Sequence, residues 1–259
     1  MQGIVYAVYF SPTHASQRLA LAVAGGIAAT SGMKMQEVDL TLPGGRLRGY
    51  QFQEEDIAVL AFPVYAGRMP LVLAEYCQKL QGQNTAAIPV AVYGNRAYDD
   101  ALVEAIDLLG AQGLVSIAAA AFIGEHSLTA KLAAGRPDAT DRQQAAAFGI
   151  KVAAKIGAGD KAVATVNGHR PYVARKPVLD LRPETKENCV SCGLCAKNCP
   201  MAIIDFEHPA QVSAGCIRCS ACVKFCPVAA KHFTDPTLAA LVQRLESNFC
   251  EPRQPELFL

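Results

Sequence analysis

Apolar runs alternate with amphipathic stretches over the first 156 residues of the chain. Three runs, Ile4–Phe10, Ile57–Phe62 and Ile88–Tyr93, are almost continuously apolar, as strands covered on both faces should be. The whole pattern predicts five strands, over Gly3–Phe10, Lys34–Leu40, Asp56–Phe62, Ala87–Tyr93 and Leu114–Phe122. Helical periodicity predicts helices over Ala15–Thr30, Pro70–Gln81, Ala97–Leu109 and Thr140–Ile156, with Pro70 and Asp138 at helix starts. This alternation predicts an α/β domain built on a doubly wound five-stranded parallel sheet.

The pattern changes after residue 158. Residues 159–187 are rich in Gly, Pro and basic residues and lack helical periodicity, which predicts an extended linker that packs along the first domain. Residues 188–235 form a compact cysteine-rich unit, and Pro236–Ser247 predicts a short amphipathic helix ahead of a Pro-containing tail. We therefore divide the chain into a first domain (1–158), a linker (159–187), a cysteine-rich domain (188–235) and a C-terminal helix and tail (236–259).

Eight of the ten cysteines form two runs with the same spacing, C-x2-C-x2-C-x3-C-P. This is the spacing of bacterial two-cluster ferredoxins, small α+β domains in which the last cysteine of each run binds the other cluster. The first expected [4Fe-4S] cluster is held by Cys189, Cys192, Cys195 and Cys226. The second is held by Cys216, Cys219, Cys222 and Cys199.

Two other uses of cysteine explain this pattern less well. A disulfide framework suits a small chain in an oxidising compartment, and a zinc site uses paired C-x2-C units with four ligands for each metal. Neither accounts for a four-cysteine run that occurs twice and ends each time in Cys-Pro. Of the two remaining cysteines, Cys77 lies in an apolar helical pattern that indicates core packing, and Cys250 lies in the tail as a free thiol.

Charge and hydropathy narrow the partners and the compartment. The net charge of +1 gives no general electrostatic reason to bind nucleic acid or an anionic membrane. The longest apolar runs, such as Leu19–Ala29 and Leu114–Gly124, are too short to span a bilayer. Met1-Gln2-Gly3 leads into an apolar strand without a basic leader segment. We expect a cytoplasmic protein that binds neither nucleic acid nor membrane.

The loop after the first predicted strand suits an anion. Ser11-Pro12-Thr13-His14-Ala15-Ser16 precedes a helix and contains no Lys or Arg. Ligands of doubly wound sheets bind beyond the carboxyl ends of the strands, where hydroxyls and N–H groups at a helix start can hold a phosphate. The same residues could serve only as an ordinary helix cap.

The loops of the first domain resemble those of flavodoxins. Val8–Thr13 resembles their phosphate loop, and Phe62–Pro70 resembles their second flavin loop. Three further segments, Val92–Asp100, Phe122–Ser127 and Ala134–Asp138, resemble flavodoxins that are fused to ferredoxin domains. The chain departs from the flavodoxin pattern at His14, where many flavodoxins have Gly. The resemblance covers nearly the whole chain and implies a flavodoxin–ferredoxin fusion that binds FMN.

The resemblance also implies roles for individual residues. The FMN phosphate is expected to contact Ser11, Thr13, His14, Ala15 and Ser16. The flavin ring is expected to be bordered on one side by Pro63, Val64, Tyr65, Ala66, Gly67 and Arg68, and on the other by Gly94, Asn95, Arg96, Tyr98 and Asp99. Tyr65 or Tyr98 is a candidate to stack on the ring. Arg68 either stabilises anionic reduced flavin or is an ordinary surface charge.

Glu125 and His126 follow the last predicted strand at the same edge of the sheet. They are the weak catalytic candidates of the chain, because a histidine there could donate a proton to flavin or substrate. The alternative that we favour is a capping pair or a contact that holds the ferredoxin domain.

Clusters carry single electrons, whereas a flavin carries one or two. The combination predicts an electron-transfer protein that exchanges electrons between two [4Fe-4S] clusters, FMN and a redox partner such as a ferredoxin or flavoprotein. The alternatives are an FMN-dependent reductase of a quinone or other small acceptor, and a redox sensor. A homodimer that pairs the clusters with its partner's flavin stays open. No G-x-G-x-x-G follows a predicted strand, so no dedicated nicotinamide domain is expected.

Overall fold

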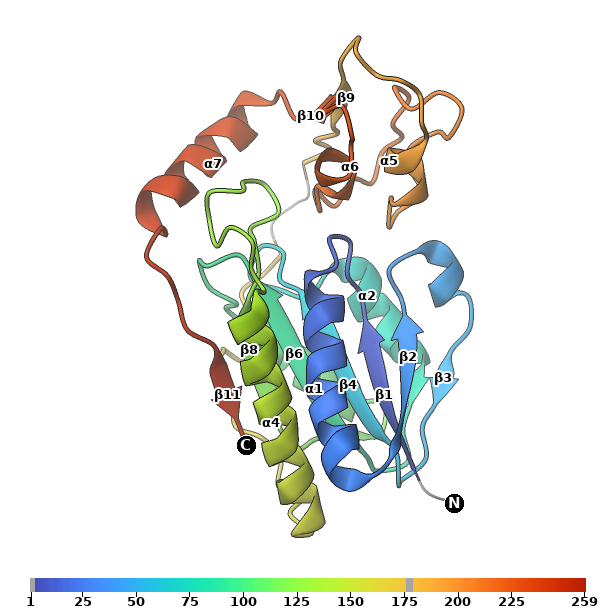
Figure 1. The fold of residues 1–259 in the computed structure, drawn as a ribbon, viewed down its shortest axis with the longest axis vertical. Helices are drawn as coiled ribbons and strands as arrows, with labels where there is room; N and C mark the ends of the chain where they lie inside the picture. The colour runs from blue at the N-terminus through green and yellow to red at the C-terminus, as the bar shows by residue number, and fades with distance from the viewer. Residues whose placement is uncertain (1–2, 176–178) are drawn as a thin grey trace.

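Five parallel strands form the centre of the computed structural model, which describes residues 3–175 and 179–259 (Figure 1). They are β1 (Ile4–Tyr9), β2 (Lys34–Asp39), β4 (Ile57–Pro63), β6 (Thr85–Tyr93) and β8 (Ala119–Ile123). Their spatial order is β2-β1-β4-β6-β8, with every neighbouring pair parallel. Counted along the chain this is the order 2-1-3-4-5 of flavodoxin-like sheets. The predicted doubly wound fold is confirmed.

The sheet is larger than the sequence predicts. The expected strand Leu114–Phe122 is divided into β7 (Leu114–Ser116) and β8, which both pair with β6. The C-terminal residues add β11 (Glu256–Phe258), which runs antiparallel to β8 along the edge of the sheet. The chain therefore returns to its first domain at its end, where only a tail was expected. Two short strands, β3 (Tyr50–Gln51) and β5 (Leu80–Gln81), pair separately.

Helices cover both faces of the sheet. One face packs against α1 (Ala15–Ser31) and α4 (Ala139–Gly157), and the other against α2 (Leu71–Tyr76) and α3 (Ala101–Gly110). Asp138, predicted as a helix start, is the N-cap of α4, and a capping box joins it to Asp141. The helix predicted over Pro70–Gln81 is shorter in the structure, because α2 gives way to a 3-10 turn, η2 (Cys77–Lys79), and then to β5. A second 3-10 turn, η1 (Pro43–Arg46), follows β2.

Glycines let α1 and α4 approach each other closely. A β-carbon on Gly149 would lie 2.2 Å from the carbonyl oxygen of Val23, and one on Gly26 would lie 2.2 Å from that of Ala146. Both obstacles are backbone atoms, which cannot rotate away. The core on this face of the sheet therefore depends on two missing side chains.

We expect Gly149→Ala to lower the free energy of unfolding by about 1–3 kcal/mol, because the added methyl group must push two helices apart. Gly157→Ala, in the last turn of the same helix, is the matched control, since a β-carbon there meets nothing within 4 Å. Thermal unfolding of the two variants followed by circular dichroism compares them. Equal melting temperatures would contradict the close packing of the helices.

The linker and the cysteine-rich unit complete the chain. The linker lies along α3, where Arg170 pairs with Asp107 at 2.6 Å and His169 N–H donates to buried Asp100. The cysteine-rich unit contains four short elements and leads into a longer helix: β9 (Glu184–Thr185), α5 (Leu194–Lys197), α6 (Ala221–Lys224), β10 (Lys231–His232) and α7 (Pro236–Asn248). β9 lies in the segment predicted as linker and pairs with β10. The unit sits over the carboxyl ends of the parallel strands (Figure 1).

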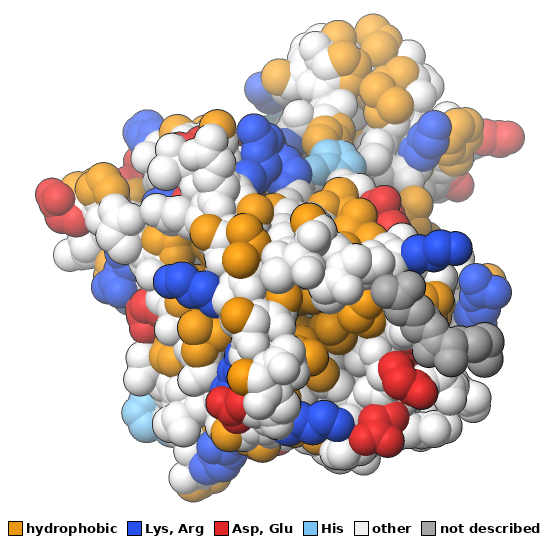
Figure 2. Space-filling model, turned by 60° about the horizontal axis from the view of Figure 1, so that its bottom comes forward, with side chains coloured by type: hydrophobic (Ala, Val, Ile, Leu, Met, Phe, Trp, Pro, Cys, Tyr) orange, Lys and Arg blue, Asp and Glu red, His pale blue; other side chains and the backbone are white. Residues whose placement is uncertain are grey.

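Charged side chains of both signs are interspersed on the face of the molecule shown in Figure 2, in keeping with the net charge of +1. No helix in the described ranges is long and apolar enough to cross a membrane.

Candidate functional site

An open cavity of ≈ 440 Å³ lies at the carboxyl ends of the parallel strands. The loops after β1, β4, β6 and β8 form it, which is the position at which doubly wound sheets bind their ligands. Ten predicted cofactor or catalytic residues line it: Ser11, Thr13, Ala15, Ser16, Pro63, Val64, Tyr65, Gly94, Glu125 and His126. Pro12, Val92, Tyr93, Gly124 and Ser127 line it as well.

One end of the cavity suits a phosphate. The first N–H groups of a helix have no partner within that helix, and α1 begins at Ala15 and Ser16 in the cavity wall. The Ser11 hydroxyl accepts from the N–H of Gln17 at 2.9 Å, so it also caps the helix. This end therefore offers hydroxyls and N–H groups at the positive end of the helix dipole.

His14 lies just outside that end. It adopts a positive φ of 63°, a conformation that glycine reaches more easily. Its side chain is exposed, and its ring centre lies 5.1 Å from that of Phe225 in the cysteine-rich unit. At the position where many flavodoxins have Gly, this chain thus has a contact between its two parts.

The second predicted flavin loop is a tight turn. Tyr65 and Arg68 exchange backbone hydrogen bonds of 3.0 and 3.2 Å, and Ala66 and Gly67 between them both have positive φ, as in a type I′ turn. A β-carbon on Gly67 would lie 2.3 Å from a carboxylate oxygen of Asp99. The turn places Tyr65 in the cavity wall.

Several predicted flavin-loop residues bind other parts of the chain. Arg68 pairs with buried Glu104 at 2.7 Å and lies outside the cavity lining. The Asn95 amide donates to the carbonyl oxygens of Phe249 and Glu251, at 2.6 and 2.9 Å. Three more predicted residues, Arg96, Tyr98 and Asp99, also lie outside the cavity lining. The Tyr98 hydroxyl donates to Glu256 of β11, and Arg96 pairs with Asp99. The third loop therefore holds the C-terminal tail in place.

Glu125 and His126 meet the cysteine-rich unit. The Lys224 ammonium donates to Glu125 Oε1 at 2.6 Å and to the His126 carbonyl oxygen at 3.2 Å. Burial acts to raise the pKa of Glu125, but hydrogen bonds from the Gly135 N–H and from Lys224 leave it below its usual value. The carboxylate is therefore ionised at neutral pH and pairs with Lys224.

The His126 ring is neutral at pH 7. Burial, with the nearby Lys224 ammonium, lowers its pKa below the usual value. Its Nδ1 accepts from the N–H of Leu128 at 3.1 Å, which assigns the proton to Nε2. His126 therefore offers an N–H donor in the cavity wall rather than a positive charge.

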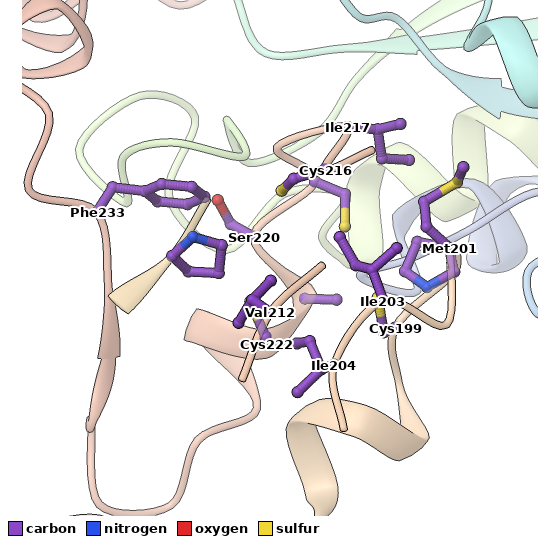
Figure 3. A pocket seen from close by; sticks show the side chains of 14 residues that line it. Cys199, Met201, Ile203, Ile204, Val212, Cys216, Ile217, Ser220, Cys222 and Phe233 are labelled. Carbon is purple, nitrogen blue, oxygen red and sulfur yellow. The ribbon is translucent and has the colours of Figure 1, made fainter. Parts of the chain in front are cut away.

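The cysteine-rich unit contains a second cavity, of ≈ 350 Å³ (Figure 3). Four cysteines line it: Cys199 from the first run, and Cys216, Cys219 and Cys222 from the second. These are the four residues predicted to hold the second cluster. The rest of the lining is mainly apolar, from residues such as Ile203, Ile204 and Val212. Four soft thiolate donors in an apolar enclosure fit an iron–sulfur cluster.

Burial makes these thiols poor acids without a metal. Burial, together with the neighbouring cysteines, Cys199 among them, raises the pKa of both Cys219 and Cys222 to about 12. Binding to iron is the means by which such thiols lose their protons. Among the described residues, no group of three or more His, Cys, Asp or Glu side chains is placed to bind a single metal ion. A [4Fe-4S] cluster instead takes four cysteine thiolates.

The other predicted set is more open to solvent. Cys192 is exposed, Cys189 and Cys226 are partly buried, and Cys195 is buried. Burial raises the pKa of Cys195, and Cys189 is near enough to add to that effect. The first set thus lies nearer the surface of the unit than the second.

The two runs share a backbone conformation as well as a spacing. Positive φ angles occur at matching positions of the runs: Ser191 and Arg218, Gly193 and Ser220, Ala202 and Ala229. In α5 and α6 the residue at the N-cap has this left-handed conformation. The repeat in sequence is therefore also a repeat in structure.

Contacts from several loops hold the cysteine-rich unit over the first cavity. The Arg46 guanidinium donates to the carbonyl oxygen of Pro200 at 2.6 Å, next to Cys199. Ile217 packs against the core of the first domain. Together with the Lys224 and His14 contacts, these bring the second cysteine run against the strand ends.

Tyr65 lies near both cavities. It lines the first cavity, and Cys219 and Cys216 of the second are close enough to act on its phenol. Burial, helped by these two cysteines, raises the pKa of Tyr65 well above its usual value. One protonated tyrosine therefore lines the predicted flavin site and lies near two predicted ligands of the second cluster.

Sequence reasoning did not identify the residues that join the two parts. Arg46, Lys224, Phe225 and Ile217 carry no motif, and their partners are distant in sequence. Lys224 did have one signal in the sequence, because it occupies the same position in the second cysteine run as Lys197 does in the first.

Comparison with known protein families gives a match on the two cysteine runs. The family described as "4Fe-4S binding domain" matches residues 186–202 and 213–229, one match on each cysteine run. No curated protein matches the chain. Solved flavodoxins are similar to its first part.

A flavodoxin from the domain Archaea is 16% identical and covers 61% of this chain and 99% of its own, with a TM-score of 0.41. Flavodoxin 1 from Bacillus cereus is 16% identical and covers 57% of this chain and 94% of its own, with a TM-score of 0.40. The flavodoxin of Streptococcus pneumonia TIGR4 is 20% identical and covers 59% of this chain and 99% of its own, with a TM-score of 0.39. At these values the fold assignment rests on the strand order described above.

Proposed function

We propose that this fusion of a flavodoxin-like domain with a 4Fe-4S ferredoxin-like region is an electron-transfer iron–sulfur flavoprotein. It binds two [4Fe-4S] clusters on the predicted cysteine sets and FMN in the cavity at the strand ends. FMN, when bound, exchanges one or two electrons and so connects one-electron carriers to two-electron chemistry. The observation that carries the proposal is the position of Tyr65, which lines the first cavity and lies near Cys219 and Cys216 of the second.

The residues of the first cavity suit FMN at both ends. The hydroxyls and N–H groups at the start of α1 would hold the phosphate, and Val64, Tyr65 and Gly94 would border the ring. A β-carbon on Gly94 would lie 2.4 Å from the His126 ring, so the backbone there can come close to a neighbour only because the residue is glycine.

The exposure of the cysteines favours an order of electron transfer. The set containing exposed Cys192 meets the external redox partner, a ferredoxin or another flavoprotein, and the enclosed set beside Tyr65 exchanges electrons with the flavin. Reduction of a quinone or other small acceptor by the flavin is the second candidate function, and the experiment below detects it.

Anaerobic preparation should yield about eight iron atoms and one FMN for each chain. After rapid mixing with a one-electron reductant, we expect the clusters to bleach first and the flavin to follow at a rate independent of protein concentration. A flavin rate that rises with protein concentration would indicate transfer between molecules. Rapid oxidation of the reduced flavin by added quinone would favour the reductase function.

The contact between the two parts allows a sharper test. Lys224→Glu replaces the 2.6 Å ion pair with Glu125 by two like charges, and we expect it to slow flavin reduction at least about tenfold. Lys197→Glu is the matched control, because Lys197 ends α5 as Lys224 ends α6 but is exposed. Equal rates in the two variants at equal iron content would contradict transfer across this contact.

A further inference from the structure

Lys231 is a buried lysine near the two cysteine runs. It lies in β10, directly after the second cysteine run, and is only 3% exposed. Its ammonium donates to the Thr185 hydroxyl at 2.7 Å and to the carbonyl oxygen of Pro209. Lysine is almost never this buried unless its charge is compensated.

No carboxylate in the described ranges lies within 4.0 Å of this ammonium, which forms none of the ion pairs found there. Its two oxygen partners are both neutral. An isolated buried cation is costly, so the compensating negative charge must come from another group nearby.

Cysteines of both predicted sets lie near Lys231. Lys231 lies in β10, which packs against α6, the helix that contains Cys222. Cys222 and Cys195 belong to one buried cluster of side chains. The N–H of Ala230, the residue before Lys231, donates to Cys226 Sγ at 3.1 Å, so the start of β10 lies against Cys226. Cys195 and Cys226 belong to the first predicted set and Cys222 to the second, so one charge acts on both.

We propose that the buried ammonium of Lys231 compensates the negative charge of both clusters. Their reduction potentials are therefore higher than they would be without this charge. This inference rests on the proposed function, because it requires clusters on both cysteine sets. A cluster held by four thiolates is an anion, and uptake of one electron from a one-electron donor adds a negative charge without forming or breaking a bond. A fixed positive charge nearby favours that uptake.

The size of the effect follows from Coulomb's law. A unit charge that acts over about 10 Å at an effective dielectric constant of about 20 changes a one-electron equilibrium by roughly tenfold. For a one-electron couple, a tenfold change corresponds to 59 mV. Because Lys231 is buried, salt should screen its effect far less than that of an exposed lysine.

The test is an anaerobic redox titration of the full chain, with the reduced clusters followed by electron paramagnetic resonance. Lys231→Gln removes the charge and should shift the equilibrium for reduction of the clusters about tenfold toward the oxidised form. This corresponds to reduction potentials lower by about 59 mV. Lys231→Arg keeps the charge and should leave the potentials near those of the wild type. Lys186→Gln is the matched control, because Lys186 is exposed beside the same strand pair.

Each outcome decides between charge and packing. A further uncharged variant, Lys231→Met, is compared with the Gln and Arg variants. Unchanged potentials in an iron-loaded Lys231→Gln protein would overturn the inference, as would loss of iron from all three Lys231 variants. Loss of iron from Lys231→Gln and Lys231→Met, with iron retained in Lys231→Arg, would support charge compensation. A wild-type protein that binds no clusters would defeat the proposed function itself.

Discussion

Cys199→Ser should remove the cluster of the second cysteine run, although Cys199 belongs to the first run. The reason is the cavity in which Cys199 meets Cys216, Cys219 and Cys222. A serine oxygen is a hard donor and replaces a soft thiolate poorly at iron. We expect roughly half of the iron and sulfide to be lost, since one of two clusters is removed.

Reference variants identify the lost cluster. Cys192→Ser damages the first run, and Cys219→Ser damages the second, so their reduced electron paramagnetic resonance spectra define what each cluster contributes. The Cys199→Ser spectrum should match that of Cys219→Ser, and the Cys226→Ser spectrum should match that of Cys192→Ser. Cys250→Ser is the control, because Cys250 is exposed in the tail, and its iron content should be unchanged. The reverse pairing of spectra would show that each run binds its own cluster.

Features carried by local pattern could be predicted from the sequence. The cysteine spacing determines which thiols gather, because each ligand run is short and the backbone repeats its left-handed residues at matching positions. The continuous apolar runs identified β1, β4 and β6, since strands buried on both faces have no polar side. The Asp138 cap was likewise visible, because a capping box joins residues three apart.

Features carried by distant contacts could not be predicted. β11 has only three residues, and it exists because it can pair with the open edge of β8. The roles expected for Arg68 and Asn95 depended on loop resemblance, whereas their partners, Glu104 and the Phe249 carbonyl oxygen, are set by tertiary packing. Lys231 carries no motif at all, and only its burial reveals the unpaired charge.

The phosphate end of the flavin cavity leads to the second large effect. We expect Thr13→Asp to weaken FMN binding by at least about 100-fold, because it places a carboxylate in the cavity wall where the phosphate is proposed to bind. Two unit charges about 4 Å apart repel by about 4 kcal/mol at an effective dielectric constant of about 20, and each 1.4 kcal/mol corresponds to roughly a tenfold change in affinity. Thr13 is only partly buried, so the fold should tolerate the change.

A second ligand and a matched variant separate this repulsion from general damage. Riboflavin has the same ring system as FMN but no phosphate, so Thr13→Asp should leave riboflavin binding nearly unchanged. Thr140→Asp makes the same substitution at an exposed position in the first turn of α4, outside the cavity lining, and should bind FMN as the wild type does. Fluorescence titration of both flavins measures these affinities. Equal losses for FMN and riboflavin would indicate a collapsed cavity, and no loss for either would place the phosphate elsewhere. A loss confined to FMN would assign phosphate recognition to the start of α1, where the chain has N–H groups and hydroxyls but no basic side chain in the loop.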